Sequence, residues 1–230
     1  MKTRLIVLTA LAACTLTATA EAHVSVTSGP AIANQSQEVT FGIGHGCAAS
    51  TLDTYQMRIE IPTGVTNVRA MSSDFGPATL NKDVSGVVTS VSWQKSAPLL
   101  PADTNFYKLT LRFKVPDAPF TQLYFKAHQV CLDATSTPVM VEWVGTPAVP
   151  AAEPAAALTI VPKRLPGWNK YTVAEHITDP SVFFADAQIV WRGTAAYSFN
   201  TVIAMLIAMT PGVSAVTDGF HPNNEIWVKY

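Results

Sequence analysis

The chain has 230 residues, a formal net charge of −1 and charged side chains at 13% of positions. This near-neutral balance offers no basic patch that could neutralise phosphates, so binding to nucleic acid is excluded as a main function. The length suffices for one large domain or two small ones.

The first 22 residues have the pattern of a secretory signal peptide. A basic start, Met1–Arg4, precedes an apolar core over Leu5–Ala13, and Ala20-Glu21-Ala22 forms an A-x-A cleavage site. The apolar run is shorter than the roughly 20 residues that a membrane-spanning helix needs. The sequence therefore predicts an exported protein, periplasmic or secreted, whose mature chain begins at His23.

A second cleavage site competes with the first. Leu11-Ala12-Ala13-Cys14 also fits a lipoprotein box, and cleavage before Cys14 would give a lipid-anchored protein with His23 inside its tether. We favour the A-x-A site because strand-like sequence follows it at once.

Residues 23–149 alternate apolar and polar side chains with a period of two, and Gly, Pro and Asn punctuate the pattern. With a first segment beginning at Val24, the count is seven strands, which predicts an antiparallel β-sandwich of immunoglobulin-like or cupredoxin-like type. The other six predicted strands are Gln37–Ile43, Tyr55–Ile61, Val87–Trp93, Phe106–Val115, Gln122–Val130 and Val139–Val144.

The predicted mature chain has two cysteines, Cys47 and Cys131. In an exported protein such a pair most simply forms one disulfide, and a soft-metal site is the alternative.

A Pro- and Ala-rich stretch at residues 150–157 predicts a semi-rigid connector that ends the sandwich. Beyond it, residues 158–230 predict a small α+β extension. Its expected strands are Leu158–Val161, Gln188–Trp191 and Glu225–Tyr230. A helix capped by Ser198 should run to Met209 and bury its apolar side chains against the strands.

A mature N-terminal histidine offers two nitrogens, the α-amine and the ring Nδ1, which can close a chelate around one metal ion. Cu(II) favours nitrogen donors and leads the divalent affinity order. His45, in a glycine-rich segment beside Cys47, is a further candidate ligand. His128 lies on a predicted strand, and we expect His176 and His221 in solvated loops.

The sequence contains no H-x-x-H, H-E-x-x-H or C-x-x-C spacing, no G-x-S-x-G elbow and no phosphate-binding glycine loop. We therefore do not expect an enzyme. Among the tryptophans, Trp143 ends the predicted sandwich and is expected close to the N-terminal strand.

Several short motifs together resemble the YcnI-like family of exported copper-binding proteins. They are His23-Val24-Ser25-Val26, His45-Gly46-Cys47, Ile61-Pro62-Thr63-Gly64 and a tryptophan before a Pro-rich connector. The tail, with Pro166-Gly167-Trp168, resembles an extension found in a proteobacterial branch of that family.

The resemblance implies a Cu(II) site made by the amine and imidazole of His23, with Trp143 close to the metal and a glutamate assisting. Arg58 stands at the position of that glutamate. Three alternatives follow: His45 supplies the missing donor, or Glu60 does, or the site is weaker and more exposed. Glu60 lies two residues after Arg58 on the same strand face, and we favour His45.

The leading hypothesis is an exported Cu(II)-binding protein in copper trafficking or homeostasis, with another periplasmic or membrane copper-handling protein as its partner. A copper-dependent oxidative enzyme and a metal-free structural or partner-binding sandwich are the alternatives.

Overall fold

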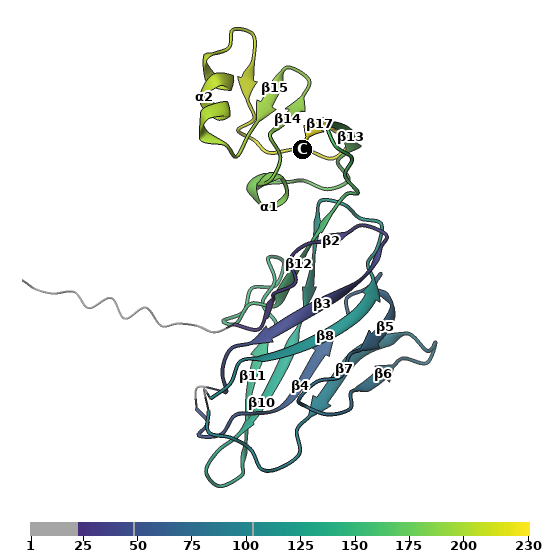
Figure 1. Cartoon of the computed structure of the whole chain (residues 1–230), viewed down its shortest axis with the longest axis vertical. Helices are drawn as coiled ribbons and strands as arrows, with labels where there is room; N and C mark the ends of the chain where they lie inside the picture. Colours follow the sequence, from purple (N-terminus) through teal and green to yellow (C-terminus); the bar gives the residue numbers. More distant parts are fainter. Residues whose placement is uncertain (1–22, 48, 103) are drawn as a thin grey trace, which may run out of the picture.

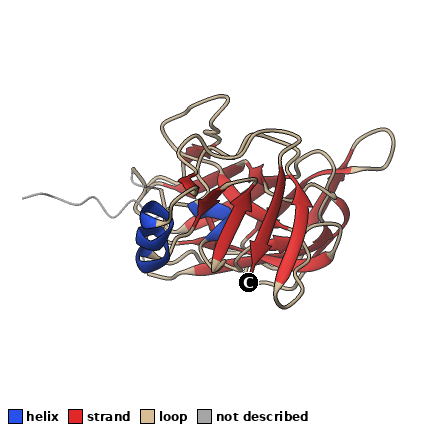
Figure 2. Cartoon of the chain, turned by 90° about the horizontal axis from the view of Figure 1, so that it is seen from above, coloured by secondary structure: helices blue, strands red, loops and turns tan. Residues whose placement is uncertain are grey.

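The computed structural model describes residues 23–47, 49–102 and 104–230, so the predicted leader and Cys14 lie outside the described residues. Figure 1 shows a large β-structure, coloured purple to teal, and a smaller part at the C-terminal end of the chain. Strands dominate both parts, and the helices lie in the smaller one (Figures 1 and 2). The predicted fold class, a mainly antiparallel β-sandwich followed by a small α+β region, is confirmed.

The first sheet of the sandwich holds strands in the order β1-β3-β8-β5. Side chains alternate along β8: Leu109, Leu111 and Phe113 are buried, whereas Lys108 and Arg112 are exposed. One face of this sheet therefore lies against the core. The strands are β1 (Ser25–Val26), β3 (Ser36–Ile43), β5 (Thr66–Ala70) and β8 (Tyr107–Lys114).

The second sheet runs in the order β11-β10-β4-β7-β6, with every neighbouring pair antiparallel. In β4, Met57 and Ile59 face the core and Arg58 is exposed, as the alternating sequence predicts. The strands are β4 (Thr54–Glu60), β6 (Thr79–Lys82), β7 (Val88–Gln94), β10 (Ala127–Leu132) and β11 (Pro138–Trp143).

A third, short sheet also belongs to the sandwich. One predicted strand is wrong in its bounds, because part of it lies in this sheet. The sheet comprises β2 (Ala31–Ile32), β12 (Ala156–Val161) and β9 (Thr121–Phe125). The single strand predicted over Gln122–Val130 is divided at Lys126: β9 pairs with β12, whereas β10 pairs with β4 and β11. The alternating pattern is continuous across Lys126, so it does not reveal that the chain changes sheets.

The predicted domain boundary at residues 150–157 also differs from the structure. Strand β12 begins at Ala156, and its Leu158 and Ile160 are fully buried in the same core as Phe41 and Phe113. The sandwich therefore extends through Val161, and the Pro- and Ala-rich stretch is a loop inside it.

The extension has a sheet and a core of its own. The sheet order is β13-β17-β14-β15-β16, and a separate buried cluster includes Val173, Phe184, Phe220 and Val228. Phe120 of the sandwich packs in this cluster, with its ring centroid 5.2 Å from that of Phe184. The elements are β13 (Trp168–Thr172), α1 (Ser181–Phe184), β14 (Ile189–Arg192), β15 (Ala195–Tyr197), α2 (Thr201–Met209), β16 (Ser214–Ala215) and β17 (Glu225–Lys229).

Helix α2 forms where it was predicted but differs in its cap and its exposure. Asn200, not Ser198, caps it, because the Asn200 side chain accepts hydrogen bonds from the backbone N–H groups of Val202 and Ile203. Ile207 is buried, whereas the side chains of Val202, Met205, Leu206 and Met209 are exposed, so the helix is not a buried core element. Within the described ranges, no helix has the length and apolar character to cross a membrane.

Cys47 and Cys131 form the predicted disulfide. It joins the loop after β3 to strand β10, and both cysteines are buried. On the chain-entropy model, a loop closed over a sequence separation of 84 stabilises the fold by about 3–5 kcal/mol.

Candidate functional site around His23

His23 lies two residues before the start of β1 and packs against the last residue of β11. Its imidazole meets the Trp143 indole edge-on, with ring centroids 5.6 Å apart and an interplanar angle of 85°. Val24, the next residue, is buried in the sandwich core, which anchors the chain at this point. The His23 side chain keeps 35% of its surface exposed. The first residue of the predicted mature chain is therefore held in place and still reaches solvent.

Trp143 is fixed in its position by a buried polar network. Its indole Nε1–H donates to Oε1 of Gln129 at 3.1 Å, and Gln129 Nε2 donates to the His45 carbonyl oxygen at 2.7 Å and to Thr54 Oγ1 at 2.8 Å. Gln129 and Trp143 are both almost fully buried. Since each polar atom of the Gln129 amide has a partner, the network orients the indole that His23 contacts.

Glu153 supplies a carboxylate beside His23. Its Oε2 lies 3.8 Å from His23 Nδ1. The Glu153 carbonyl oxygen accepts hydrogen bonds from the backbone N–H groups of Val144, at 3.1 Å, and Gly145, at 2.8 Å. This pairing draws the Pro- and Ala-rich loop back over the end of β11, next to Trp143.

Gly145 makes this close return of the loop possible. A Cβ at position 145 would lie 3.0 Å from both the Ala151 nitrogen and the Glu153 carbonyl oxygen, closer than side-chain atoms ordinarily approach backbone. Glu153 was not among the ligands predicted from the sequence. It is the one charged residue in the stretch 146–157, which is the signal that could have identified it.

The site offers two side-chain donors of different kinds, an imidazole nitrogen and a carboxylate oxygen. In the part of the chain that the structure describes, no three His, Cys, Asp or Glu side chains gather in a way that could hold a metal ion. A metal held by these two side chains would take its remaining donors from the backbone or from water. The α-amine that cleavage after Ala22 would release is such a donor.

His45 lies in the loop between β3 and β4, where its Nδ1 contacts the Gly46 carbonyl oxygen. The connection to the His23 site runs through the main chain, because it is the His45 carbonyl oxygen that Gln129 binds. The structure thus gives His45 a position in the network behind Trp143, and its imidazole stays a predicted ligand.

Glu60 lies on the other face of the second sheet from Trp143. Its Oε1 is 2.8 Å from Nε2 of His128 and 3.0 Å from Nη2 of Arg58, and the other ring nitrogen of His128 contacts Glu142. These side chains form a charged cluster across β4, β10 and β11. Trp143, in contrast, faces the core, so the thickness of the sheet separates the Glu60 carboxylate from the indole that His23 contacts. Glu153, and not Glu60, is the carboxylate that lies beside His23.

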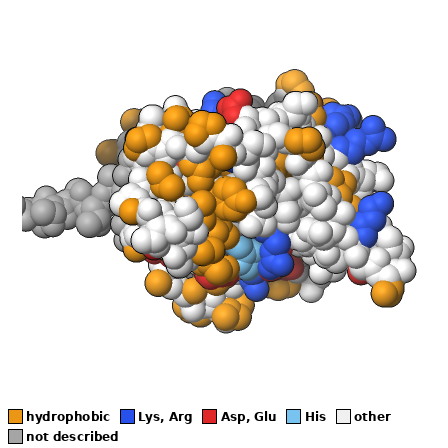
Figure 3. All heavy atoms as spheres, turned by 90° about the horizontal axis from the view of Figure 1, so that it is seen from below, with side chains coloured by type: hydrophobic (Ala, Val, Ile, Leu, Met, Phe, Trp, Pro, Cys, Tyr) orange, Lys and Arg blue, Asp and Glu red, His pale blue; other side chains and the backbone are white. Residues whose placement is uncertain are grey.

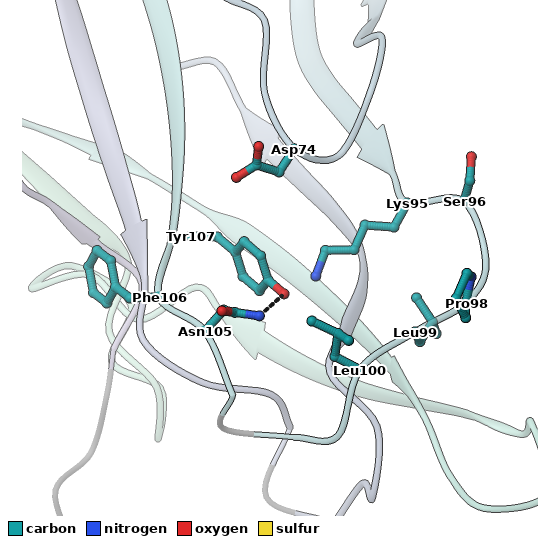
Figure 4. Close-up of a pocket in the computed structure, with 9 residues that line it drawn as sticks. All are labelled: Asp74, Lys95, Ser96, Pro98, Leu99, Leu100, Asn105, Phe106 and Tyr107. Carbon is teal, nitrogen blue, oxygen red and sulfur yellow. Dashed lines mark hydrogen bonds between the residues drawn. The ribbon is translucent and has the colours of Figure 1, made fainter.

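A cavity of about 340 Å³ lies elsewhere on the sandwich, lined in part by Lys95, Asn105 and Tyr107 (Figure 4). Lys95 Nζ is 3.3 Å from the buried Asp53 carboxylate, and the Tyr107 hydroxyl donates to the same carboxylate. Burial lowers the pKa of Lys95, and Asp53 opposes that shift. Burial and the hydrogen bond to Asp53 raise the pKa of Tyr107 to about 12. The three groups bind one another and link the residue before β4, the residue after β7 and strand β8, which is a structural role.

On the face seen in Figure 3, hydrophobic side chains gather mainly in the left half, whereas most Lys and Arg side chains lie to the right. The exposed apolar residues of the sandwich include Leu100, Phe106 and Met140. These exposed apolar side chains do not identify a ligand or a partner.

Comparison with known proteins gives a family and no activity. A solved structure from Nocardia farcinica, described as an uncharacterised protein with an immunoglobulin-like fold, is 22% identical and covers 60% of this chain and 98% of its own, with a TM-score of 0.47. The search of curated proteins finds no match. The family model described as "Domain of unknown function (DUF1775)" matches residues 23–160, which begins at His23 and ends within β12. The chain therefore belongs to the DUF1775 family, to which YcnI also belongs.

Proposed function

We propose that this protein is exported, is cleaved after Ala22, and binds Cu(II) as cargo for delivery to another copper-handling protein. The ligands are the α-amine and Nδ1 of His23 and the carboxylate of Glu153. The observation that carries the proposal is the 3.8 Å separation between His23 Nδ1 and Glu153 Oε2. Two donors that each lie about 2 Å from one shared ion are at most about 4 Å apart, so an ion fits between these atoms.

The donor set agrees with copper chemistry. Two nitrogens from one residue favour Cu(II), and the Glu153 carboxylate adds a negative charge that offsets part of the charge of the ion. The chelate needs a free amine, so binding would begin only when the leader has been removed. Arg58, which the resemblance had placed near the metal, lies instead with Glu60 in the charged cluster across β4, β10 and β11. Its charge therefore does not oppose the ion.

The surroundings of His23 favour a carrier that releases its metal. Trp143 covers one side of the imidazole, whereas His23 and Glu153 keep 35% and 34% of their side-chain surfaces exposed. An acceptor protein could reach an ion at this edge without unfolding the sandwich. The partner expected for such transfer is a periplasmic or membrane copper-handling protein.

The test is a Cu(II) titration of protein that begins at His23, followed by tryptophan fluorescence and calorimetry. A Glu153→Gln variant should bind Cu(II) more weakly, because the neutral amide is a poorer ligand than the carboxylate. Glu38→Gln, at an exposed glutamate on β3, is the matched control and should leave the affinity unchanged. Equal affinities for the Glu153→Gln and Glu38→Gln proteins would refute the role of Glu153.

A further inference from the structure

Two histidines of the extension, His176 and His221, lie side by side although 44 residues separate them in the sequence. Ile177 and Phe220 form an antiparallel bridge, with N–H···O distances of 2.8 and 3.0 Å. In such a pair the next residues outward also face each other, which places His176 opposite His221. Their ring centroids are 4.6 Å apart and their planes differ by 57°. Both side chains are exposed, so an ion in solution can reach them.

The orientation of the His221 ring is set by a carboxylate behind it. Nε2 of His221 lies 3.0 Å from Oδ2 of Asp218, and Oδ1 of Asp218 accepts a hydrogen bond from Nη2 of Arg192 at 2.9 Å. Because the carboxylate accepts and does not donate, Nε2 carries the proton, and Nδ1 of a neutral ring keeps its lone pair. A histidine held by a carboxylate in this way is the usual arrangement behind a metal ligand.

The backbone of this segment needs a glycine to bring the histidines together. Gly219 has φ of +75°, and a Cβ there would lie 2.1 Å from the Ile177 carbonyl oxygen. Arg192 Nη1 donates to the Gly219 carbonyl oxygen at 2.7 Å, and the His221 N–H donates to Oδ1 of Asn224 at 2.9 Å. The segment that carries Asp218 and His221 is thus fixed on both sides.

We propose that His176 and His221 form a second metal site, which binds a divalent transition-metal ion through one imidazole nitrogen each, Cu(II) in preference to Zn²⁺. An imidazole whose nitrogen is about 2.0 Å from a metal has its ring centroid about 3 Å from that metal. Two imidazoles whose nitrogens bind the metal at an angle of about 90° therefore have ring centroids about 4.5 Å apart. The observed 4.6 Å matches this separation. Imidazole suits copper, nickel and zinc, and the divalent affinity order puts Cu(II) first.

The site is open, because the described residues place no third His, Cys, Asp or Glu donor around the same point. Water would fill the remaining positions, which gives an exchangeable ion. Asp218 is a positioning residue and not a ligand, since its carboxylate is occupied by His221 and Arg192. This site stands independently of the one proposed at His23.

The experiment uses the full mature chain with His23→Ala, so that the N-terminal chelate cannot contribute. Calorimetry with Cu(II) should show one remaining site, with nitrogen coupling from two imidazoles in the EPR spectrum. Adding His176→Ala or His221→Ala should abolish that site. Binding that is unchanged by these substitutions, or absent from the His23→Ala protein, would overturn the proposal without bearing on the His23 site.

The role of Asp218 is tested in the same His23→Ala background. Asp218→Asn should weaken Cu(II) binding by about 10–100-fold, the usual cost of losing such a partner. Asp186→Asn, which removes another exposed, arginine-paired aspartate of the extension, should leave it unchanged. Melting curves of the metal-free proteins show whether either variant has lost its fold. Similar affinities for the two folded variants would remove Asp218 from the site.

Discussion

The carboxylate of Glu153 lies 3.8 Å from the imidazole of His23, although the two residues come from opposite ends of the sandwich sequence. The contact exists because the Glu153 carbonyl oxygen pairs with the backbone of Val144 and Gly145 at the end of β11. Trp143 of the same strand supports the His23 ring. One strand end therefore positions both the indole and the carboxylate around the first residue of the predicted mature chain.

Glu60→Gln should leave Cu(II) affinity unchanged, because Glu60 lies on the outer face of the second sheet with His128 and Arg58. The substitution weakens exposed or half-exposed ion pairs, so the free energy of unfolding should fall by no more than about 1 kcal/mol. Calorimetric titration and urea unfolding of the mature protein measure the two quantities. A marked loss of copper affinity would return Glu60 to the metal site.

Trp143→Phe should destabilise the sandwich by about 1–3 kcal/mol, since it leaves the buried Oε1 of Gln129 without its donor. Trp227→Phe, at a tryptophan that is 47% exposed, is the matched control and should cost far less. Urea unfolding of both variants and of the parent protein measures the two losses in the free energy of unfolding. Equal costs would mean that the Gln129 network does not orient the indole.

Replacing both cysteines, Cys47→Ala with Cys131→Ala, should lower the free energy of unfolding by about 2–5 kcal/mol. The disulfide closes a long loop between the β3–β4 connection and β10, so its loss mainly frees the unfolded chain. Denaturant unfolding of the double variant and of the oxidised parent gives the difference. A stability equal to that of the parent would show that the disulfide does not restrain the unfolded state.

Ionisation of the Tyr107 hydroxyl should lower the stability of the fold at alkaline pH. The pKa of this hydroxyl is raised from 10.0 to about 12 in the folded protein, mainly by burial and then by the hydrogen bond to Asp53. A raised pKa means that the folded state favours the protonated phenol, so this stability is complete below pH 10 and is lost as the pH rises through about 12. The free energy of unfolding, measured across this pH range, should fall less steeply with pH for Tyr107→Phe than for the parent protein. Identical slopes would contradict the shift.

Local patterns predicted much of the sandwich. The alternation of Met57 and Ile59 with Arg58 gave β4 almost to the residue, and the two cysteines gave the disulfide. A period of two depends on neighbours along the chain, which is why these features could be inferred from the residues themselves.

The features that sequence did not predict depend on distant partners. Nothing local to Lys126 shows that the chain passes from β9 to β10, because both strands alternate in the same way. The pattern of Leu158 and Ile160 indicates a strand but not which core buries it. Glu153 was missed for the same reason, since its place beside His23 comes from backbone pairing with Gly145.

The central claim is that the free amine of His23 is a copper ligand, and one extra residue tests it. Cu(II) should be titrated into protein that begins at His23 and into protein that begins at Ala22, with affinity from calorimetry and coordination from EPR. The extended protein should bind Cu(II) more weakly and show a changed nitrogen coupling, because an amide replaces the amine. Equal affinity with identical EPR spectra would contradict the role of the amine.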